Sequence, residues 1–443
     1  MAAAKRRVVQ QVAKLLSKSP VSREEVLEVL AELGEQATAA LLETLQDNDY
    51  RVRMAAAKYL GELREAVAVP ALVESLSDSS KNVQRHAADA LTNIGQPAVE
   101  PLLDALIGKD QSARKWAAEA LGNIGDRSVA LELVKRLTDP NIEVQRAAVT
   151  ALGELKNKKA IEPLVEVLET DNVELAKAAA EALGKIRSDI AIEPLIRALS
   201  SPSIDVQAAA ATALMQVGSG CVPYLLEQLE SPDYVVRRWV AEILGEIGDE
   251  TAREALIVAL DDPNTRVVHY AAISLGKVGK PSVIRYLAAL LEHPDKDVRC
   301  AAVEGLAHVG SHQTVQYLSA MLQDEDWVTR LTAVRGLGNV ASRTCLAPLI
   351  GALSDQEWSV RKHAVDGLAR VGIRKGAMDA LIAIADDVRV SVRRSVAYAL
   401  GELGDKTSIP VLRKLTSDAD DKVREAAEAA LTKLDPLCPE PED

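Results

Sequence analysis

A segment of about 31 residues recurs along the chain, and this period constrains the fold more than any other feature. A leucine in segments such as AAAKYLGEL and AAEALGNIG marks each copy, at Leu60, Leu91, Leu121, Leu152, Leu183, Leu214, Leu244, Leu275, Leu306, Leu337, Leu368, Leu400 and Leu431. A weaker copy surrounds Leu30 in EEVLEVLAELG. Such a period is typical of proteins in which each repeat buries its apolar face against its neighbours.

Each copy carries the pattern of an amphipathic helix. We number the repeat from position 0, eight residues before the marker leucine, which is usually valine, as at Val52 and Val83. Positions 0, 4, 8 and 11 are apolar or small in nearly every copy, which is one face of a helix with 3.6 residues per turn. A polar N-cap such as Asp49 precedes the helix, and glycine at position 12, such as Gly95, predicts a left-handed end.

A second apolar segment follows at once in each copy, as in AVEPLLDAL and AIEPLIRAL. We therefore predict an all-α, right-handed solenoid (an α-α superhelix) of about 14 two-helix repeats. Residues 1–34 are expected to form a degenerate capping helix pair. Residues 35–434 are expected to form the repeat solenoid, and residues 435–443 an acidic, proline-rich tail.

Glycine recurs inside the first helix of the repeat, at position 9. Glycine there costs up to about 1 kcal/mol relative to alanine. Its repetition therefore predicts that a neighbouring helix passes close by, at Gly61, Gly122, Gly153, Gly184, Gly245, Gly276, Gly338 and Gly401.

The unit VRxAAxxLGxIGD…AxxPLxxxL resembles the short HEAT-like repeat of the phycobilisome-lyase type. The segments VRRWVAEILGEIGDETAREALIVALDD (236–262) and VRRSVAYALGELGDKTSIPVLRKLTSD (392–418) match it closely. The resemblance covers almost the whole chain and is specific for the fold. Its members include bilin lyases, phycobilisome-degradation factors, an iron-dependent hydroxylase of a modified lysine, and scaffolds. In binding libraries built on this repeat, the varied positions correspond to 2, 3, 6 and 10 and to residues just before 0, and they face the concave side.

The large aromatic residues concentrate at these expected concave or concave-rim positions. All four tryptophans lie there, and none occupies a core position. The candidate partner-binding residues are Trp116, a first cluster of Tyr234, Trp239, His269 and Tyr270, and a second of Trp327, Trp358, His363 and Tyr398 with Arg394. Exposed Trp, Tyr and Arg often anchor protein interfaces. The alternative for each tryptophan is that it fills a groove between neighbouring repeats.

Arginine at position 1 resembles the ladder of Asp and Arg that links neighbouring HEAT repeats. It stands at Arg53, Arg114, Arg237, Arg299, Arg330, Arg361, Arg393 and Arg424. A carboxylate from the adjacent turn can accept both arms of the guanidinium, so we interpret this column as structural. It is interrupted at Gln84, Gln145, Ala176, Gln207 and Val268.

The charge of the chain argues against nucleic acid as a partner. The formal net charge is −13 with a pI near 5.2, without a basic footprint. Basic residues at position 2, such as Arg238 and Lys362, have acidic residues four positions later that neutralise them. No stretch approaches 18 apolar residues, so no membrane span is predicted. Four widely spaced cysteines without a CxxC pair favour a cytoplasmic protein.

The sequence favours a non-catalytic scaffold that binds a protein or peptide partner on its concave face, without a cofactor or metal. No His-Glu dipeptide is present, which disfavours the lysine hydroxylase. His308 and His312 are four residues apart, but Gly310 ends the helix between them, so a turn pair is preferred over a metal site. A bilin lyase or chromophore chaperone stays open as the alternative, since concave aromatics with Arg238 or Arg394 could hold a tetrapyrrole.

Overall fold

The structure, a computed structural model, describes residues 35–372 and 376–434, and these residues form helices without strands. The chain divides into two compact units, the first ending at Cys221 and the second beginning at Val222. The expected capping pair at 1–34 and the expected tail at 435–443 lie outside the described residues.

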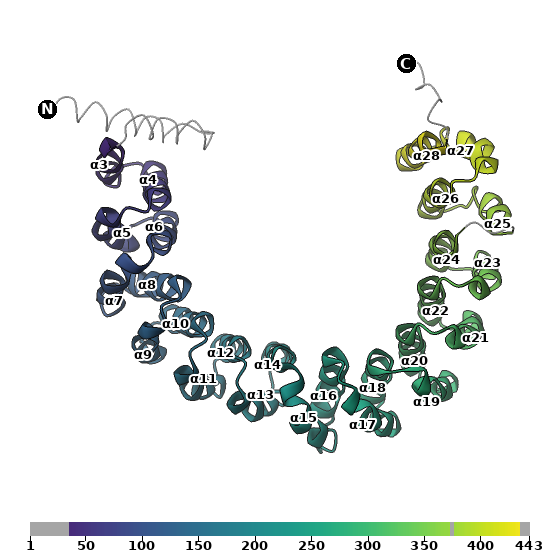
Figure 1. Cartoon of the computed structure of the whole chain (residues 1–443), viewed down its shortest axis with the longest axis horizontal. Coiled ribbons are helices and arrows are strands. Elements are labelled where there is room, and N and C mark those ends of the chain that lie inside the picture. Colours follow the sequence, from purple (N-terminus) through teal and green to yellow (C-terminus); the bar gives the residue numbers. More distant parts are fainter. Residues whose placement is uncertain (1–34, 373–375, 435–443) are drawn as a thin grey trace. The chain divides into compact units, whose positions relative to one another are not determined.

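Unit 1 alternates long first helices with short second helices. Its first helices are α4 (Tyr50–Leu63), α6 (Lys81–Ile94), α8 (Gln111–Ile124), α10 (Ile142–Leu155), α12 (Val173–Ile186) and α14 (Ile204–Val217). Its second helices are α3 (Glu35–Thr44), α5 (Val69–Glu74), α7 (Val99–Leu106), α9 (Ala130–Val134), α11 (Ile161–Leu168) and α13 (Ile192–Ala198). Within the unit the first helices form one layer and the second helices the other (Figure 1).

Unit 2 repeats the same arrangement in two layers (Figure 1). Its first helices are α16 (Tyr234–Ile247), α18 (Thr265–Val278), α20 (Lys296–Val309), α22 (Trp327–Val340), α24 (Trp358–Val371), α26 (Val390–Leu403) and α28 (Asp421–Leu434). Its second helices are α15 (Val222–Gln228), α17 (Arg253–Val258), α19 (Ile284–Ala289), α21 (Val315–Ala320), α23 (Leu346–Ala352), α25 (Ala377–Ala383) and α27 (Ile409–Leu415). The predicted all-α solenoid of two-helix repeats is thereby confirmed.

Most first helices begin with the predicted capping bond, and each predicted end glycine except Gly279 has a positive φ. The Asp49 side chain accepts from the Arg51 amide, and equivalent bonds cap most other first helices. Ser80 and Ser203 begin their helices without such a bond. Gly279 was expected in the left-handed conformation but is extended, with φ −85°. Its missing side chain instead leaves room for the Leu275 carbonyl and Val283.

The core between the two layers consists of small and aliphatic side chains. Every marker leucine from Leu60 to Leu400 is fully buried, together with the valine at position 0 of most repeats and several alanines. The chain contains no phenylalanine, and none of its four tryptophans is among the buried residues. Apart from the buried Tyr59, the large aromatic side chains therefore stay at least partly exposed.

The glycines at position 9 sit where first helices of neighbouring repeats touch. A Cβ on Gly153 would lie 2.8 Å from the Cα of Ala182, and one on Gly184 equally close to the Cα of Ala213. The same close approach occurs at the other predicted glycines, which confirms the expectation. Between α20 and α22 the small residue has moved to the other helix, where Gly336 faces the Ala307 methyl. At these junctions the missing side chain allows the close approach, from whichever helix the glycine comes.

Seven of the eight column arginines form the predicted ladder between neighbouring repeats. Arg424, in the last described helix, instead donates to the Asp418 carbonyl and to Asp421 of its own helix. Arg330 donates to both carboxylate oxygens of Asp355, at 2.7 and 3.0 Å, and to the carbonyl of Asp324 at 2.9 Å. The same fork joins each of the other pairs, Arg53–Asp78, Arg114–Asp139, Arg237–Asp262, Arg299–Asp324, Arg361–Asp387 and Arg393–Asp418. Burial alone would raise the pKa of Asp355, but the hydrogen bonds from Arg330 and the Glu357 amide outweigh it and lower that pKa.

Where the arginine is missing, its carboxylate partner is missing too. Gln145 stands at position 1 of its repeat, and Thr170 occupies the place where the next repeat would supply aspartate. Gln145 Nε2 keeps only the bond to the carbonyl within its own repeat, 2.6 Å from Asp139 O. No buried charge is therefore left unpaired at this junction.

One stretch, Ile204–Gln228, has the length and mean hydropathy (1.3) of a membrane span. It is divided into α14, a 3-10 turn at Gly218–Cys221 and α15, and Gly218 ends α14 at φ +77°. A helix of 14 residues is about 21 Å long, short of the hydrocarbon core of about 30 Å. The stretch is therefore better explained by apolar core helices of the solenoid, with 44% of the window buried.

Candidate partner-binding face

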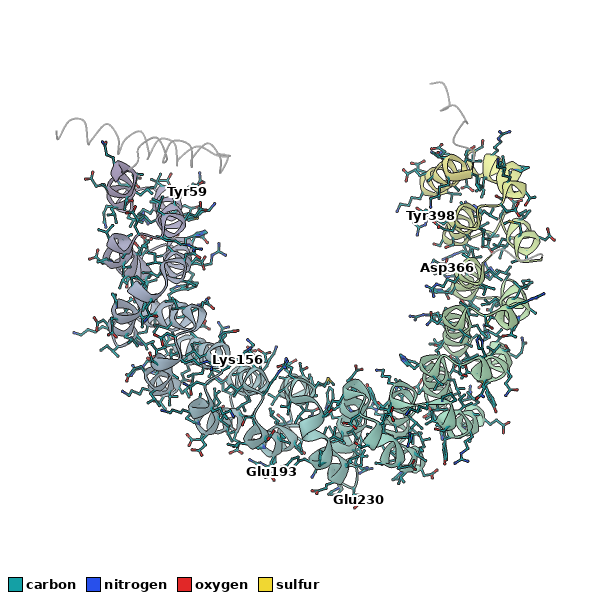
Figure 2. All side chains as sticks on the ribbon, viewed as in Figure 1. Tyr59, Lys156, Glu193, Glu230, Asp366 and Tyr398 are labelled. Carbon is teal, nitrogen blue, oxygen red and sulfur yellow. The ribbon has the colours of Figure 1, made fainter. Side chains whose placement is uncertain are left out.

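The first-helix face, which we define as the surface carrying positions 2, 3, 6 and 10 and the two residues before position 0, holds all ten candidate residues. Asp366 and Tyr398 project from this layer in unit 2, whereas Glu193 projects from the second helices of unit 1 (Figure 2). The structure thus places the candidates on one layer in each unit, and their mutual contacts differ between the two predicted clusters.

In the first cluster, an arginine lies between two aromatic rings. The Arg238 guanidinium is 4.0 Å from the centroid of the Trp239 ring and 5.3 Å from that of Tyr270, on the next first helix. Its Nη1 is 3.5 Å from Glu242 Oε2. A cation over an aromatic face is attracted by the ring quadrupole, so the three side chains hold one another in place across α16 and α18.

The other groups of the first cluster extend this stack. The rings of His269 and Tyr270 meet edge to face at 5.1 Å, and His269 Nδ1 lies 3.0 Å from the carbonyl oxygen of Asp297 on α20. Burial raises the pKa of Glu242, against the opposing effect of Arg238. Tyr234 begins α16 and is 39% exposed. Three successive first helices therefore contribute to one polar and aromatic patch.

The second cluster is spread over successive helices rather than joined. Trp327 begins α22 and is 44% exposed, Trp358 begins α24, and Tyr398 on α26 is 54% exposed. His363 Nδ1 lies 2.8 Å from Ser359 O within its own helix. No contact between these four rings occurs among the residues that the structure describes. They form a discontinuous row of separate side chains.

Sequence reasoning did not single out the residues that surround Trp358. The Arg389 guanidinium lies 5.1 Å from the Trp358 ring centroid. Val388 and Val390 flank it and are 85% and 37% exposed. Val388 and Arg389 belong to the loop before α26, and Val390 begins the helix. An alignment of the repeats would have shown the two valines as apolar residues at surface positions.

The Trp116 side chain takes part in packing within unit 1. Its indole N–H donates to Gln84 Oε1 at 3.0 Å, and Gln84 in turn donates to the Asp78 carbonyl. The Lys115 ammonium lies 4.9 Å from the ring centroid. Trp116 therefore packs across the junction between α6 and α8, in line with the alternative considered for each tryptophan, while part of its ring stays exposed.

The basic column at position 2 is neutralised in part by the expected pairs four residues apart. Arg238 faces Glu242, and Lys362 Nζ lies 3.0 Å from Asp366 Oδ2. Lys115 instead pairs with Glu143 of the next repeat at 3.5 Å. Arg394 lies half-buried on α26. These pairs offset the charge of Arg238, Lys362 and Lys115 on this face.

Two pockets open on the first-helix face, one in each unit. The first has a volume of about 210 Å³ and is lined mainly by polar residues such as Lys115, Glu119 and Arg146. The second, of about 230 Å³, includes His363, Asp366 and Arg370. Both are smaller than the 300 Å³ or more typical of small-molecule sites. Within the described residues, no group of three His, Cys, Asp or Glu side chains could hold a metal ion.

Nine overlapping segments of the chain match the family of HEAT repeats, at residues 9–80, 69–138, 130–215, 192–274, 222–294, 254–329, 284–353, 318–388 and 346–432. No curated protein matches the sequence.

Several solved structures share the fold. Kap121p superimposes with a TM-score of 0.64 at 14% identity, covering 98% of this chain and 57% of that chain. Its complex with Nup53p gives 0.65 at 14% identity, with the same coverage. Importin beta gives 0.57 at 15% identity, covering 98% of this chain and 73% of that one. The chain thus spans little more than half the length of Kap121p, and at these identities the similarity shows the fold alone.

Proposed function

Because the chain belongs to the HEAT-repeat family, we propose that it is a non-catalytic scaffold whose first-helix face binds a protein or peptide partner. The observation that carries this proposal is the stack of Trp239, Arg238 and Tyr270, which lies on the surface layer and outside the core. Tryptophan, tyrosine and arginine are the residues that most often contribute the binding energy of protein interfaces. Stacking fixes their side chains before a partner arrives, which lowers the entropy lost on binding.

The second row supplies further anchors in the same unit. Trp327, Trp358 and Tyr398 present rings on three successive first helices, with Arg389 over Trp358. Isolated anchors at intervals suit an elongated partner that crosses several repeats better than a compact ligand. The fold is compatible with this use, since Kap121p has been crystallised bound to Ste12p, Nup53p and Pho4p.

The repeat subtype, the side of the solenoid that binds the partner and the cellular location also belong to the proposed function. We assign the repeats to the short type of the phycobilisome-lyase proteins, on the basis of their period of about 31 residues, and the partner to the concave side. The cytoplasm is the proposed location, supported by the free thiols of Cys221, Cys300 and Cys345. The bilin-lyase alternative gains no support from the two pockets on this face, because both are small.

The test is partner capture by a triple variant of the full chain. Trp239→Ala, Trp327→Ala and Trp358→Ala together remove three rings that contribute little to the core. The partner is first captured from a native lysate by the wild-type chain, identified by mass spectrometry and rebound in purified form. Loss of anchors of this kind costs about 2 kcal/mol each, so we expect at least about a thirtyfold weaker affinity, with a melting temperature within a few degrees of the wild type.

The matched control removes three exposed apolar side chains from the second helices, with Leu131→Ala, Tyr224→Ala and Val258→Ala. These residues are 52%, 40% and 73% exposed, so the control loses comparable apolar surface from the opposite layer. Unchanged binding by the tryptophan variant, or an equal loss in the control, would contradict the proposal.

A further inference from the structure

Three successive first helices of unit 1 begin with an exposed aliphatic residue. Ile142, Val173 and Ile204 are the first residues of α10, α12 and α14, and 42%, 39% and 70% of their surfaces are exposed. None belongs to the core or to the candidate set above. Aliphatic side chains scattered singly over a surface are normal, but here they occupy one repeat position on three neighbouring helices.

An acidic residue directly follows each of these aliphatic residues. Glu143, Glu174 and Asp205 occupy the second position of the same three helices. Glu143 is held by Arg146 at 2.7 Å and by Lys115 at 3.5 Å. Among the described residues Glu174 and Asp205 form no ion pair, so their charges are open to a partner.

The packing of the helices aligns these pairs into a row. Gly153 meets Ala182, and Gly184 meets Ala213, so α10, α12 and α14 stack in the same register. Neighbouring helix starts also touch directly, since Asn141 donates to Gln111 Oε1 at 2.7 Å. Stacked helices lie about 8 to 10 Å apart, which sets the spacing between successive aliphatic residues in the row.

We propose that this row, Ile142–Glu143, Val173–Glu174 and Ile204–Asp205, is a docking surface on the first-helix face of unit 1 that binds an extended, basic peptide segment with an apolar residue at every third position. A polyproline II helix has three residues per turn and a rise of about 3.1 Å, so its residues i, i+3 and i+6 lie on one face about 9.3 Å apart. That interval matches the spacing of stacked helices. Lysine or arginine beside each apolar residue would face the acidic side chains.

The negative charge of the row disfavours the binding of a second copy of the chain at this surface. Each copy presents the same acidic side chains on this surface and carries a net charge of −13, so two rows would repel each other. A basic segment is attracted instead. The inference extends the proposed function to unit 1, and it uses none of the residues on which that function rests.

The experiment measures binding of synthetic peptides to the full chain by fluorescence anisotropy. The probe is a labelled peptide of about twelve residues that repeats Leu-Lys-Pro, long enough to span three helices. Peptides that repeat Leu-Glu-Pro or Ser-Lys-Pro remove the charge match or the apolar match. We expect the probe to bind at least about tenfold more tightly than either of these peptides.

Two variants locate the binding on the row. Ile142→Ser, Val173→Ser and Ile204→Ser together should weaken probe binding by at least about tenfold. Val67→Ser, Ile107→Ser and Ile190→Ser, at exposed positions elsewhere in unit 1, should not. The Glu174→Lys and Asp205→Lys variant should lose the Leu-Lys-Pro peptide and gain the Leu-Glu-Pro peptide. All these positions are exposed, so circular dichroism should show an unchanged fold.

The inference is overturned if the probe binds no better than the Leu-Glu-Pro peptide, or if the serine variant of the row binds it as the wild type does. Tighter binding of a helical peptide with leucine at every seventh position would overturn the extended mode. The Trp239, Trp327 and Trp358 variant must bind the probe normally. That requirement separates a failure of this surface from a failure of the proposed function.

Discussion

The pairing of Arg330 with Asp355 allows the contribution of the ladder to be measured with a variant that the chain itself supplies. The two side chains are only 14% and 9% exposed, and they share a two-pronged contact at 2.7 and 3.0 Å. Removing one partner leaves the other charge mostly buried and unpaired, which costs about 3 kcal/mol. Arg330→Gln alone and Asp355→Thr alone should each lose about this amount of stability.

The double variant should be no worse than either single one. It recreates the junction between α10 and α12, where Gln145 and Thr170 stand in place of the pair and Gln145 keeps its bond to the Asp139 carbonyl. The coupling energy between the two substitutions should therefore exceed about 2 kcal/mol. Hydrogen exchange of the α22 and α24 amides reports the local opening free energy that each variant changes.

The exposed pair Lys433–Glu402 is the control for this cycle. Its side chains are 57% and 63% exposed, and the atoms are 2.5 Å apart. Exposed ion pairs contribute little, so Lys433→Gln and Glu402→Gln should couple by less than about 0.5 kcal/mol. A coupling this small at Arg330 and Asp355 would refute the reasoning that burial makes the ladder strong.

Two further predictions concern stability. Gly153→Ala should destabilise unit 1 by about 1 to 3 kcal/mol, because the new Cβ would lie 2.8 Å from the Ala182 Cα. The Cβ of Gly351→Ala would meet nothing within 4 Å, so this variant should gain up to about 1 kcal/mol of stability. Urea unfolding measures both free energies, and equal effects would contradict the packing role of glycine. The hydrogen bond from Arg393 lowers the pKa of Asp418, so the native state binds fewer protons than the unfolded state. The stability that this ion pair contributes should be complete above about pH 5 and lost as the pH falls below about 4. Thermal unfolding at a series of pH values measures this loss. A loss between about pH 7 and 5 would contradict the prediction.

Much of the fold was predictable because the residue at each repeat position has one structural role. The caps, the core positions and the glycines at position 9 lie where the period places them. The ladder contained a further signal in the sequence. Seven column arginines, from Arg53 to Arg393, are followed by an aspartate two residues before the next N-cap, whereas Gly108 and Thr170 hold that place after Gln84 and Gln145. Reading both columns together would have identified the partners.

The details of the candidate face were less predictable from the sequence. The first cluster depends on Arg238 reaching the ring of Tyr270 in the next repeat, which requires the side-chain conformation and the stagger between α16 and α18. For Trp116, the sequence could not decide between a binding role and packing, because the bond to Gln84 joins residues 32 positions apart. Gly279 satisfied the left-handed pattern, but the nearby Val283 side chain and Leu275 carbonyl fix it in an extended conformation.

Site-specific photocrosslinking within unit 2 tests most directly whether a partner binds the first-helix face. A benzophenone amino acid replaces Tyr398 on α26, which is 54% exposed, or Tyr224 on α15, which is 40% exposed. Both replacements exchange one exposed aromatic ring for another, on opposite layers of the same unit. The account predicts that the captured partner crosslinks to position 398 and not to position 224. Crosslinking only through position 224 would contradict it.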